Sequence, residues 1–256
     1  RVQTEGLTSE IRTLAATFNE MLDRLSDSFR RLSQFSANIA HELRTPVNNL
    51  RGELEVALGK ARSPEEYREV LASALEECER LSRLVDQLLF IARTEHAETQ
   101  VPFEAVTVAR ELEAVGAFYE AAATEGGVRL SLGCPLALQA ALNRELFQCA
   151  VGNLVANALA HTLSGGRVTV TAEAEGSGLR LHVADTGCGI APEHLPHVFD
   201  RFYRAERMAR SRRGFGLGLA LVRGIAQLHH GSVELRSSPG QGTVATLRLP
   251  LRRQPA

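Results

Sequence analysis

The sequence lacks several features that would assign a chain to a common class of protein. Its net charge is −1, so no excess of basic residues would attract nucleic acid. No apolar run reaches the roughly 18 residues that a membrane helix needs, and no signal peptide is recognisable. The four cysteines form no CxxC pair, which argues against a zinc ribbon or a disulfide framework and suits a reducing cytoplasm.

What the chain does have is 44% apolar residues, enough to bury a core. In its first hundred residues they recur at steps of three and four, which predicts long helices packed along a seam. The stretch "GKARSPEE" interrupts this pattern. Gly59 is expected to end the first helix in the left-handed conformation, and Ser63 and Glu66 form a capping box for the second.

Two long helices joined by a short loop predict an antiparallel hairpin. A single hairpin leaves its apolar face in water, so we expect two chains to pair as a homodimeric four-helix bundle. The seam positions are Leu14, Phe18, Leu22, Leu25, Phe29, Leu32, Ser36, Ile39, Leu43, Leu50, Leu54 and Ala57 in the first helix, and Leu71, Leu75, Cys78, Leu81, Val85, Leu88 and Ala92 in the second.

After a polar connector near residue 100, the periodicity changes. Alternating runs predict five strands: "VRLSL", "RVTVTAEA", "GLRLHVAD", "SVELRSS" and "TVATLRLP". Helical stretches are expected near 107–124, 143–162 and 217–229, and "AEGSGLRL" and "SSPGQGTV" are typical of antiparallel hairpins. Helices mixed with such strands predict an α+β sandwich.

Four polar motifs follow one another in this second half. "NLVANALAH" places Asn153 and Asn157 on one helix face, because residues four apart are neighbours there. "DTGCGI" directly follows a strand, "FDRFYRA" comes next, and "GFGLGLALV" opens a helix, whose free N–H groups favour phosphate. Each motif alone is also compatible with a turn, a polar helix position or a solvated surface. No Gly-Lys-Ser/Thr follows, so this is not a P-loop.

In this order the four motifs resemble the ATP-binding domain shared by histidine kinases, gyrase-type ATPases, Hsp90 and MutL, over roughly residues 100–251. The resemblance implies ATP and Mg²⁺ as cofactors, with Asn157 as the magnesium ligand and Asn153 supporting the triphosphate or the metal. Asp185 would accept a hydrogen bond from the adenine amino group. The other implied nucleotide-site residues are His161, Gly187, Gly189, Phe199, Phe202, Gly214, Gly216, Gly218, Leu219 and Thr243.

Within that resemblance, Phe199 and Phe202 would pack the base of a mobile lid over about 200–213. The family often has a basic residue where this chain has Ala160, so a phosphate contact from that motif is in doubt. The lid arginines could compensate, or they could form an ordinary solvated surface; these are Arg207, Arg210, Arg212 and Arg213.

The residue at position 153 helps to decide whether the site hydrolyses ATP or transfers its γ-phosphoryl group to another residue. Gyrase-type ATPases carry a glutamate there that activates water, whereas the Asn153 amide cannot take a proton. A nucleophile is offered by His41, which lies roughly 160° around its helix from the seam and points out of the bundle. Its surroundings, "HELRTP", match the phosphoacceptor motif H-E-x-x-T-P, and the chain resembles histidine kinases over most of its length.

The resemblance assigns roles around His41. Neutral His41 would attack the γ-phosphorus, Glu42 would accept from or orient the other ring nitrogen, and Thr45 would position water for dephosphorylating the partner. Pro46 should bend the helix. We therefore expect ATP-dependent autophosphorylation of His41, phosphoryl transfer to an aspartate of a response regulator, and phosphatase activity toward that regulator. The alternatives are a gyrase- or chaperone-type ATPase and a catalytically degenerate kinase scaffold.

The first residues of the chain also resemble a segment found in histidine kinases. "EIRTLAATFNEMLDRL" is similar to the second helix of a HAMP signal relay. The expected domains are a HAMP remnant over 1–27, a dimerisation and phosphotransfer domain over 28–98, and a catalytic ATP-binding domain over 99–256. The chain would be the cytoplasmic portion of an inner-membrane protein, and "FSANIAHELRTPVNNL" is similar to the heavy-metal-sensing subgroup.

Overall fold

A computed structural model describes residues 9–94, 101–205 and 215–251. The chain divides into two compact units, residues 1–82 and 83–256. Within the described helices, none is long and apolar enough to cross a membrane.

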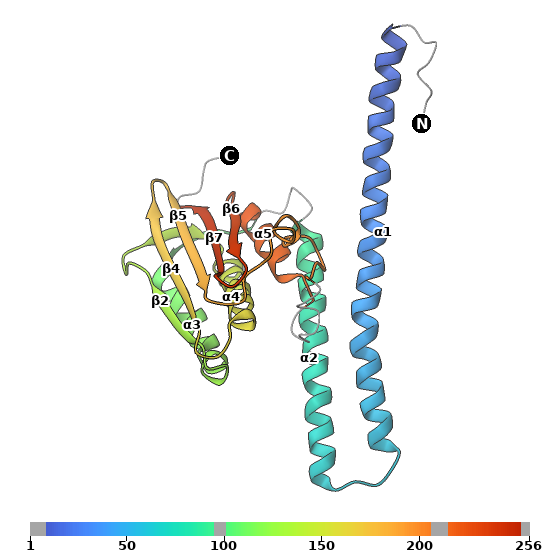
Figure 1. Ribbon diagram of the computed structural model, residues 1–256, viewed down its shortest axis with the longest axis vertical. Helices are drawn as coiled ribbons and strands as arrows, with labels where there is room; N and C mark the ends of the chain where they lie inside the picture. Colours follow the sequence, from blue (N-terminus) through green and yellow to red (C-terminus); the bar gives the residue numbers. More distant parts are fainter. Residues whose placement is uncertain (1–8, 95–100, 206–214, 252–256) are drawn as a thin grey trace. The chain divides into compact units, whose positions relative to one another are not determined.

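The first unit is the predicted helical hairpin (Figure 1). Helix α1 (Ser9–Leu58) runs antiparallel to the beginning of α2 (Pro64–Thr94), and the Ser73 hydroxyl on α2 donates to Glu53 Oε2 on α1 at 3.0 Å. Apolar seam residues remain exposed in this single chain, because one hairpin has only one partner helix for each seam. The exposed fractions are 71% for Leu14, 44% for Phe18, 51% for Leu25, 65% for Phe29, 63% for Leu71 and 61% for Leu75.

The capping box at the start of α2 is confirmed. The Glu66 N–H donates to Ser63 Oγ at 3.2 Å, and the Ser63 N–H donates to Glu66 Oε2 at 2.8 Å. The left-handed conformation predicted for Gly59 was wrong, since its φ is not positive. Two other contacts satisfy carbonyls at this helix end: the Gly59 N–H donates to Glu55 O at 3.0 Å and the Arg62 guanidinium to Val56 O at 3.4 Å.

The second unit is the predicted α+β sandwich. Its five-stranded sheet has the order β2-β4-β5-β7-β6, in which β2 and β4 are parallel and the other pairs antiparallel. The helices α3, α4 and α5 lie on one face of the sheet (Figure 1). The bounds are β2 Arg129–Gly133, β4 Arg167–Glu175, β5 Gly178–Asp185, β6 Ser232–Ser238 and β7 Gly242–Pro250, with α3 Val108–Glu125, α4 Arg144–His161 and α5 Gly218–Leu228.

The alternation along the strands explains why the sheet has one buried face. On β4, Val168 and Val170 are buried in the core, whereas Arg167 and Thr171 point to the opposite side and are exposed. We call this second side the open face. Many of its charged residues form ion pairs. Arg180 pairs with Glu173 and Glu175 and Arg248 with Glu175 and Glu234 across strands, and Arg236 pairs with Glu234 within β6.

Three short elements were not predicted. The strands β1 (Glu104–Thr107) and β3 (Gln139–Leu142) form a separate antiparallel pair, and a 3₁₀ turn, η1, covers Leu195–His197. The sequence did not reveal this pair because β1 lies at the end of the polar connector and "QAAL" has no β-branched residue.

A buried histidine links three elements of this unit. The Asn143 N–H before α4 donates to His229 Nε2 at 3.0 Å, and His229 Nδ1–H donates to Ile225 O on α5 at 2.8 Å. Its ring meets Phe103 edge-on, with centroids 5.2 Å apart. Burial lowers the pKa of His229, so the folded protein holds this ring neutral.

This arrangement predicts a pH dependence of stability. Because the pKa of His229 is lower in the folded state, the unfolded chain binds the extra proton first when the pH falls below about 6.5. The free energy of unfolding should therefore be smaller at pH 5.5 than at pH 7.5 in urea titrations followed by circular dichroism. His229→Gln should reduce this pH-dependent loss more than His230→Gln does, because burial is the main cause of the lowered pKa of His229 and the charge of exposed His230 adds less to it. Equal losses in wild type and His229→Gln would contradict the assignment. His161, whose pKa is also lowered by burial, adds to the loss, and Asp185, whose pKa is raised by burial, opposes it.

Candidate functional site

The carboxylate of Asp185, at the end of β5, organises the candidate site. Its Oδ1 accepts hydrogen bonds from the Gly187 N–H at 2.8 Å and the Thr243 N–H at 3.1 Å. It thus ties the turn after β5 to the beginning of β7. Its Oδ2 has no hydrogen bond to any residue that the structure describes, which leaves one acceptor for a ligand. Burial raises the pKa of Asp185, against the opposing effects of the two N–H donors and of His161.

Glycines let backbone segments meet around this carboxylate. Gly189 and Gly242 have φ of 69° and 82°, which side chains rarely adopt. A Cβ atom on Gly189 would collide with Ser238 O, and one on Gly242 with Asp185 O. The predicted glycine turn is therefore built by close backbone approach.

The asparagine motif on α4 lies beside the start of α5. The Asn153 amide donates to Cys149 O at 2.8 Å, and a Cβ atom on Gly218 would lie 2.9 Å from Asn153 Oδ1. Asn157, one turn later, is half-buried and makes no side-chain hydrogen bond within the described part of the chain. The motif thus offers the Asn157 amide and the Asn153 Oδ1 oxygen near a helix N-terminus, where phosphate is favoured.

The end of α4 also contacts the turn that follows Asp185, in the motif "DTGCGI". We call this turn the adenine-type turn, because the resemblance assigns Asp185 to the adenine amino group. The carbonyl of His161 accepts the Cys188 N–H at 3.2 Å, and a Cβ atom on Gly187 would collide with it. His161 itself is half-buried, and burial lowers its pKa, while the Asp185 carboxylate opposes that shift. Thr243 contacts Asp185 through its backbone N–H group. Its hydroxyl oxygen lies 2.9 Å from Ser237 Oγ.

The two ends of the predicted lid are joined by their backbones. Phe202 has a positive φ of 62°, and its N–H donates to Gly216 O at 2.9 Å. The Phe199 ring lies under the Arg223 guanidinium, 5.9 Å from the ring centroid. Leu219 is half-buried in the first turn of α5. The remaining predicted positions here fall outside the described residues; they are Gly214, Arg207, Arg210, Arg212 and Arg213.

Sequence reasoning gave His194 and His197 no role. The structure places His194 Nδ1 2.8 Å from the Tyr203 hydroxyl and the His197 ring 5.4 Å from the Tyr203 ring. Tyr203 follows Phe202, so this contact fixes the residue next to the Phe202–Gly216 bond. In the sequence, the aromatic residue that follows "DRF" is the feature that could have indicated this contact. Among the described residues no group of three or more His, Cys, Asp or Glu could hold a metal ion.

The residues around the candidate nucleophile lie on α1, in the other unit. His41 and Thr45 are exposed and Glu42 is half-buried, as expected for a face turned away from the seam. The Thr45 hydroxyl donates to His41 O at 3.2 Å. Helix α1 continues through Pro46 without interruption, and Pro46 is buried; the bend there stays a prediction.

Comparison with known proteins identifies a family for both the helical hairpin and the α+β sandwich. Residues 143–253 match the family described as histidine kinase-, DNA gyrase B- and HSP90-like ATPase, and residues 31–97 match the His Kinase A (phospho-acceptor) domain. Together the two matches cover more than half of the chain. The chain belongs to the histidine kinase family.

Curated relatives agree with this family. The chain is 38% identical over 242 residues to the sensor protein IrlS of Burkholderia pseudomallei, covering 94% of this chain and 52% of IrlS. It is 37% identical over 259 residues to the sensor histidine kinase CusS of Escherichia coli K12, covering 98% and 52%. The chain thus spans about half the length of these curated relatives. They are consistent with the heavy-metal-sensing subgroup that the sequence predicted.

Solved structures show the same fold. The Acinetobacter baumannii histidine kinase AdeS aligns with a TM-score of 0.69 at 24% identity, covering 82% of this chain and 98% of AdeS. Full-length ShkA in complex with AMPPNP aligns with a TM-score of 0.65 at 27% identity, covering 86% and 46%.

Replacing Gly189 by alanine tests whether a collision with the neighbouring backbone destabilises the fold beyond the strain of a positive φ. Gly189→Ala adds a Cβ atom that collides with Ser238 O, whereas Gly240→Ala has a similar φ of 76° and nothing within 4 Å. Gly240→Ala should lose about 1–2 kcal/mol of unfolding free energy from strain alone. Gly189→Ala should lose more in urea unfolding and should abolish binding of a fluorescent ATP analogue. Equal effects of the two variants would show that the collision is unimportant.

Removing the Tyr203 hydroxyl should weaken the lid anchor. Tyr203→Phe loses the hydrogen bond to His194, worth about 1 kcal/mol, so the KM for ATP should rise about fivefold with little change in kcat. His194→Asn, which keeps a polar atom near the Nδ1 position, should be closer to wild type than His194→Ala. Tyr67→Phe removes a hydroxyl that donates to Lys60 O in the other unit and serves as the control. An unchanged KM in Tyr203→Phe would overturn the anchoring role.

Proposed function

We propose that this chain acts as an ATP-dependent protein-histidine kinase. ATP bound in the second unit phosphorylates His41, and the phosphoryl group then passes to an aspartate on the receiver domain of a response regulator. The observation that carries the proposal is the convergence on Asp185, where the adenine-type turn, the end of α4 and the start of β7 meet. An exposed His41 in "HELRTP" supplies the acceptor.

The residues present fit a magnesium nucleotide. Asp185 Oδ2 is an open acceptor for the adenine amino group, and Asn157 has an uncommitted amide oxygen for a metal ion. Gly216 and Gly218 present backbone at the start of α5, where phosphate charge is favoured. When bound, Mg²⁺ would offset the charge of the phosphates. Phe199, Phe202, His161 and Thr243 frame the same region, as described above.

The amide at position 153 favours transfer over hydrolysis. Asn153 Nδ2 donates to Cys149 O, so the side chain is held in place and offers no proton acceptor to a water molecule. A neutral His41 nitrogen instead forms the bond to the γ-phosphorus as the bond to ADP breaks. Glu42 accepts from or orients the other ring nitrogen. In the second step an aspartate oxygen of the regulator replaces the His41 nitrogen on phosphorus.

The exposed seam supports a homodimer. Phe29, Leu71 and Leu75 are each more than 60% exposed on the hairpin, and exposed apolar surface of this kind marks an interface. Pairing two hairpins would bury these residues in a four-helix bundle. The His41 face, turned away from the seam, stays accessible to ATP and to the regulator.

We extend the proposal to regulation. Thr45, one turn after His41, is exposed and would position water for dephosphorylating the regulator. The proposed domain boundaries are 1–27, 28–98 and 99–256, and the boundary between the last two lies outside the described residues. The relatives are sensor kinases about twice as long as this chain, which supports its being the cytoplasmic portion of a membrane-spanning sensor.

Labelling with ATP tests the reaction. Wild type incubated with γ-labelled ATP and Mg²⁺ should acquire a label that is labile in acid and stable in alkali, as a phosphoramidate is. His41→Gln should lose the label while still binding a fluorescent ATP analogue as well as wild type does. Thr45→Ala should retain the label, because Thr45 is proposed to act only in dephosphorylation. A label that persists in His41→Gln, or release of free phosphate alone, would refute the proposal.

A further inference from the structure

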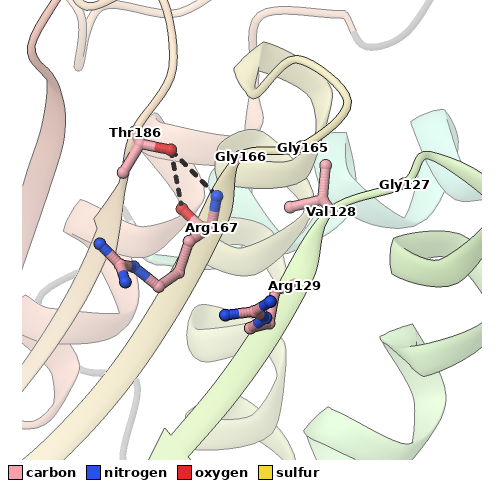
Figure 2. A pocket seen from close by; sticks show the side chains of 7 residues that line it. All are labelled: Gly127, Val128, Arg129, Gly165, Gly166, Arg167 and Thr186. Carbon is pink, nitrogen blue, oxygen red and sulfur yellow. Dashed lines mark hydrogen bonds between the residues drawn. The ribbon is translucent and has the colours of Figure 1, made fainter.

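A hollow of about 430 Å³ lies where β2 and β4 begin (Figure 2). This volume falls within the range of small-ligand sites. Its wall contains three glycines and only a few side chains that can contact a ligand. The lining residues are Gly127, Val128, Arg129, Gly165, Gly166, Arg167 and Thr186. None of them belongs to the nucleotide-site residues described above, although Thr186 directly follows Asp185.

Two arginines stand side by side at this hollow. Arg129 and Arg167 are register partners in the parallel pair β2–β4, so their side chains leave the sheet on the same side. Figure 2 shows both side chains in front of the strands. Like charges on directly opposed strand residues are destabilising. An anion bound between the two guanidinium groups would offset this repulsion.

No such charge is present among the residues that the structure describes. Neither Arg129 nor Arg167 makes an ion pair there, whereas Arg180, Arg236 and Arg248 on the same open face each contact a glutamate. The next pair along the same face is neutral. It consists of Ser131 and Thr169, whose hydroxyl oxygens lie 3.2 Å apart.

The backbone around the hollow is held by hydrogen bonds. The Arg129 N–H donates to Gly166 O at 3.0 Å, and the Gly165 N–H donates to Gly127 O at 2.8 Å. The Arg167 N–H donates to Thr186 Oγ1 at 2.9 Å, which fixes the Thr186 side chain at the edge (Figure 2). The Thr186 hydroxyl in turn donates to Arg167 O at 3.5 Å. These groups are committed to the fold, so a ligand would be held by the two guanidinium groups.

We propose that this hollow binds a small oxyanion, a phosphate- or carboxylate-bearing molecule, between the guanidinium groups of Arg129 and Arg167. Guanidinium groups match the geometry of both oxyanions and bind them with paired hydrogen bonds. The glycine-lined wall offers few side chains that could select the residues of a peptide, which favours a small ligand over a protein segment. The site does not depend on the proposed kinase activity.

Nuclear magnetic resonance of the arginine Nε–H groups tests this site. The whole chain, with ADP present to fill the nucleotide site, is titrated with inorganic phosphate and separately with citrate at fixed ionic strength, because salt screens exposed charges. Two signals, assigned by their absence in Arg129→Gln and Arg167→Gln, should shift and saturate. Saturation by phosphate and saturation by citrate both support the site, and their midpoints identify the preferred oxyanion.

Variants with the same change in charge provide the control. Thermal stabilisation by the same anions should have a midpoint at least tenfold weaker in Arg129→Gln/Arg167→Gln than in wild type. Arg236→Gln/Arg248→Gln removes two charges from the same open face and should stay within twofold of wild type. Linear shifts without saturation, equal weakening in both double variants, or binding of only a glutamate-rich peptide would each overturn the proposal.

Discussion

The second unit depends on one carboxylate that accepts two backbone N–H groups. Asp185 Oδ1 receives the Gly187 and Thr243 N–H groups, so one side chain at the end of β5 positions both the turn that follows and the start of β7. Donors aimed at a carboxylate favour its charged form, whereas burial favours the neutral form, and burial dominates here. The fold uses one oxygen of Asp185 and leaves the other to a ligand.

The glycines make this geometry possible because they allow contacts that no side chain permits. Gly187 lies against His161 O, Gly218 against Asn153 and Gly216 against the Phe202 backbone. Each therefore joins two motifs that are far apart in the sequence.

The periodic parts of this fold were predictable from the sequence, and the parts that depend on tertiary contacts were not. The seam residues gave the hairpin, and alternation along "RVTVTAEA" gave β4, because burial on one face imposes those periods. Gly59 was predicted with the wrong conformation because the Arg62 side chain, six residues after Val56, satisfies the helix end instead. The bond between His194 and Tyr203, and the pairing of Arg129 with Arg167, likewise join residues whose proximity no local pattern indicates.

The same division holds for the candidate site. Asp185, Asn153 and Asn157 could be selected from motifs, since their residue types carry the chemistry. That Asp185 is bound to Thr243 could not, because the two positions are brought together only by the pairing of β5 with β7.

Nucleotide binding by Asp185→Asn tests the central claim most directly. The amide keeps an oxygen that can accept the Gly187 and Thr243 N–H groups, but it replaces the free acceptor with a donor that faces the adenine amino group. Calorimetry with ADP should show affinity at least tenfold weaker than wild type, with the unfolding free energy within about 1 kcal/mol of wild type. Unchanged ADP affinity in a folded Asp185→Asn variant would contradict the account.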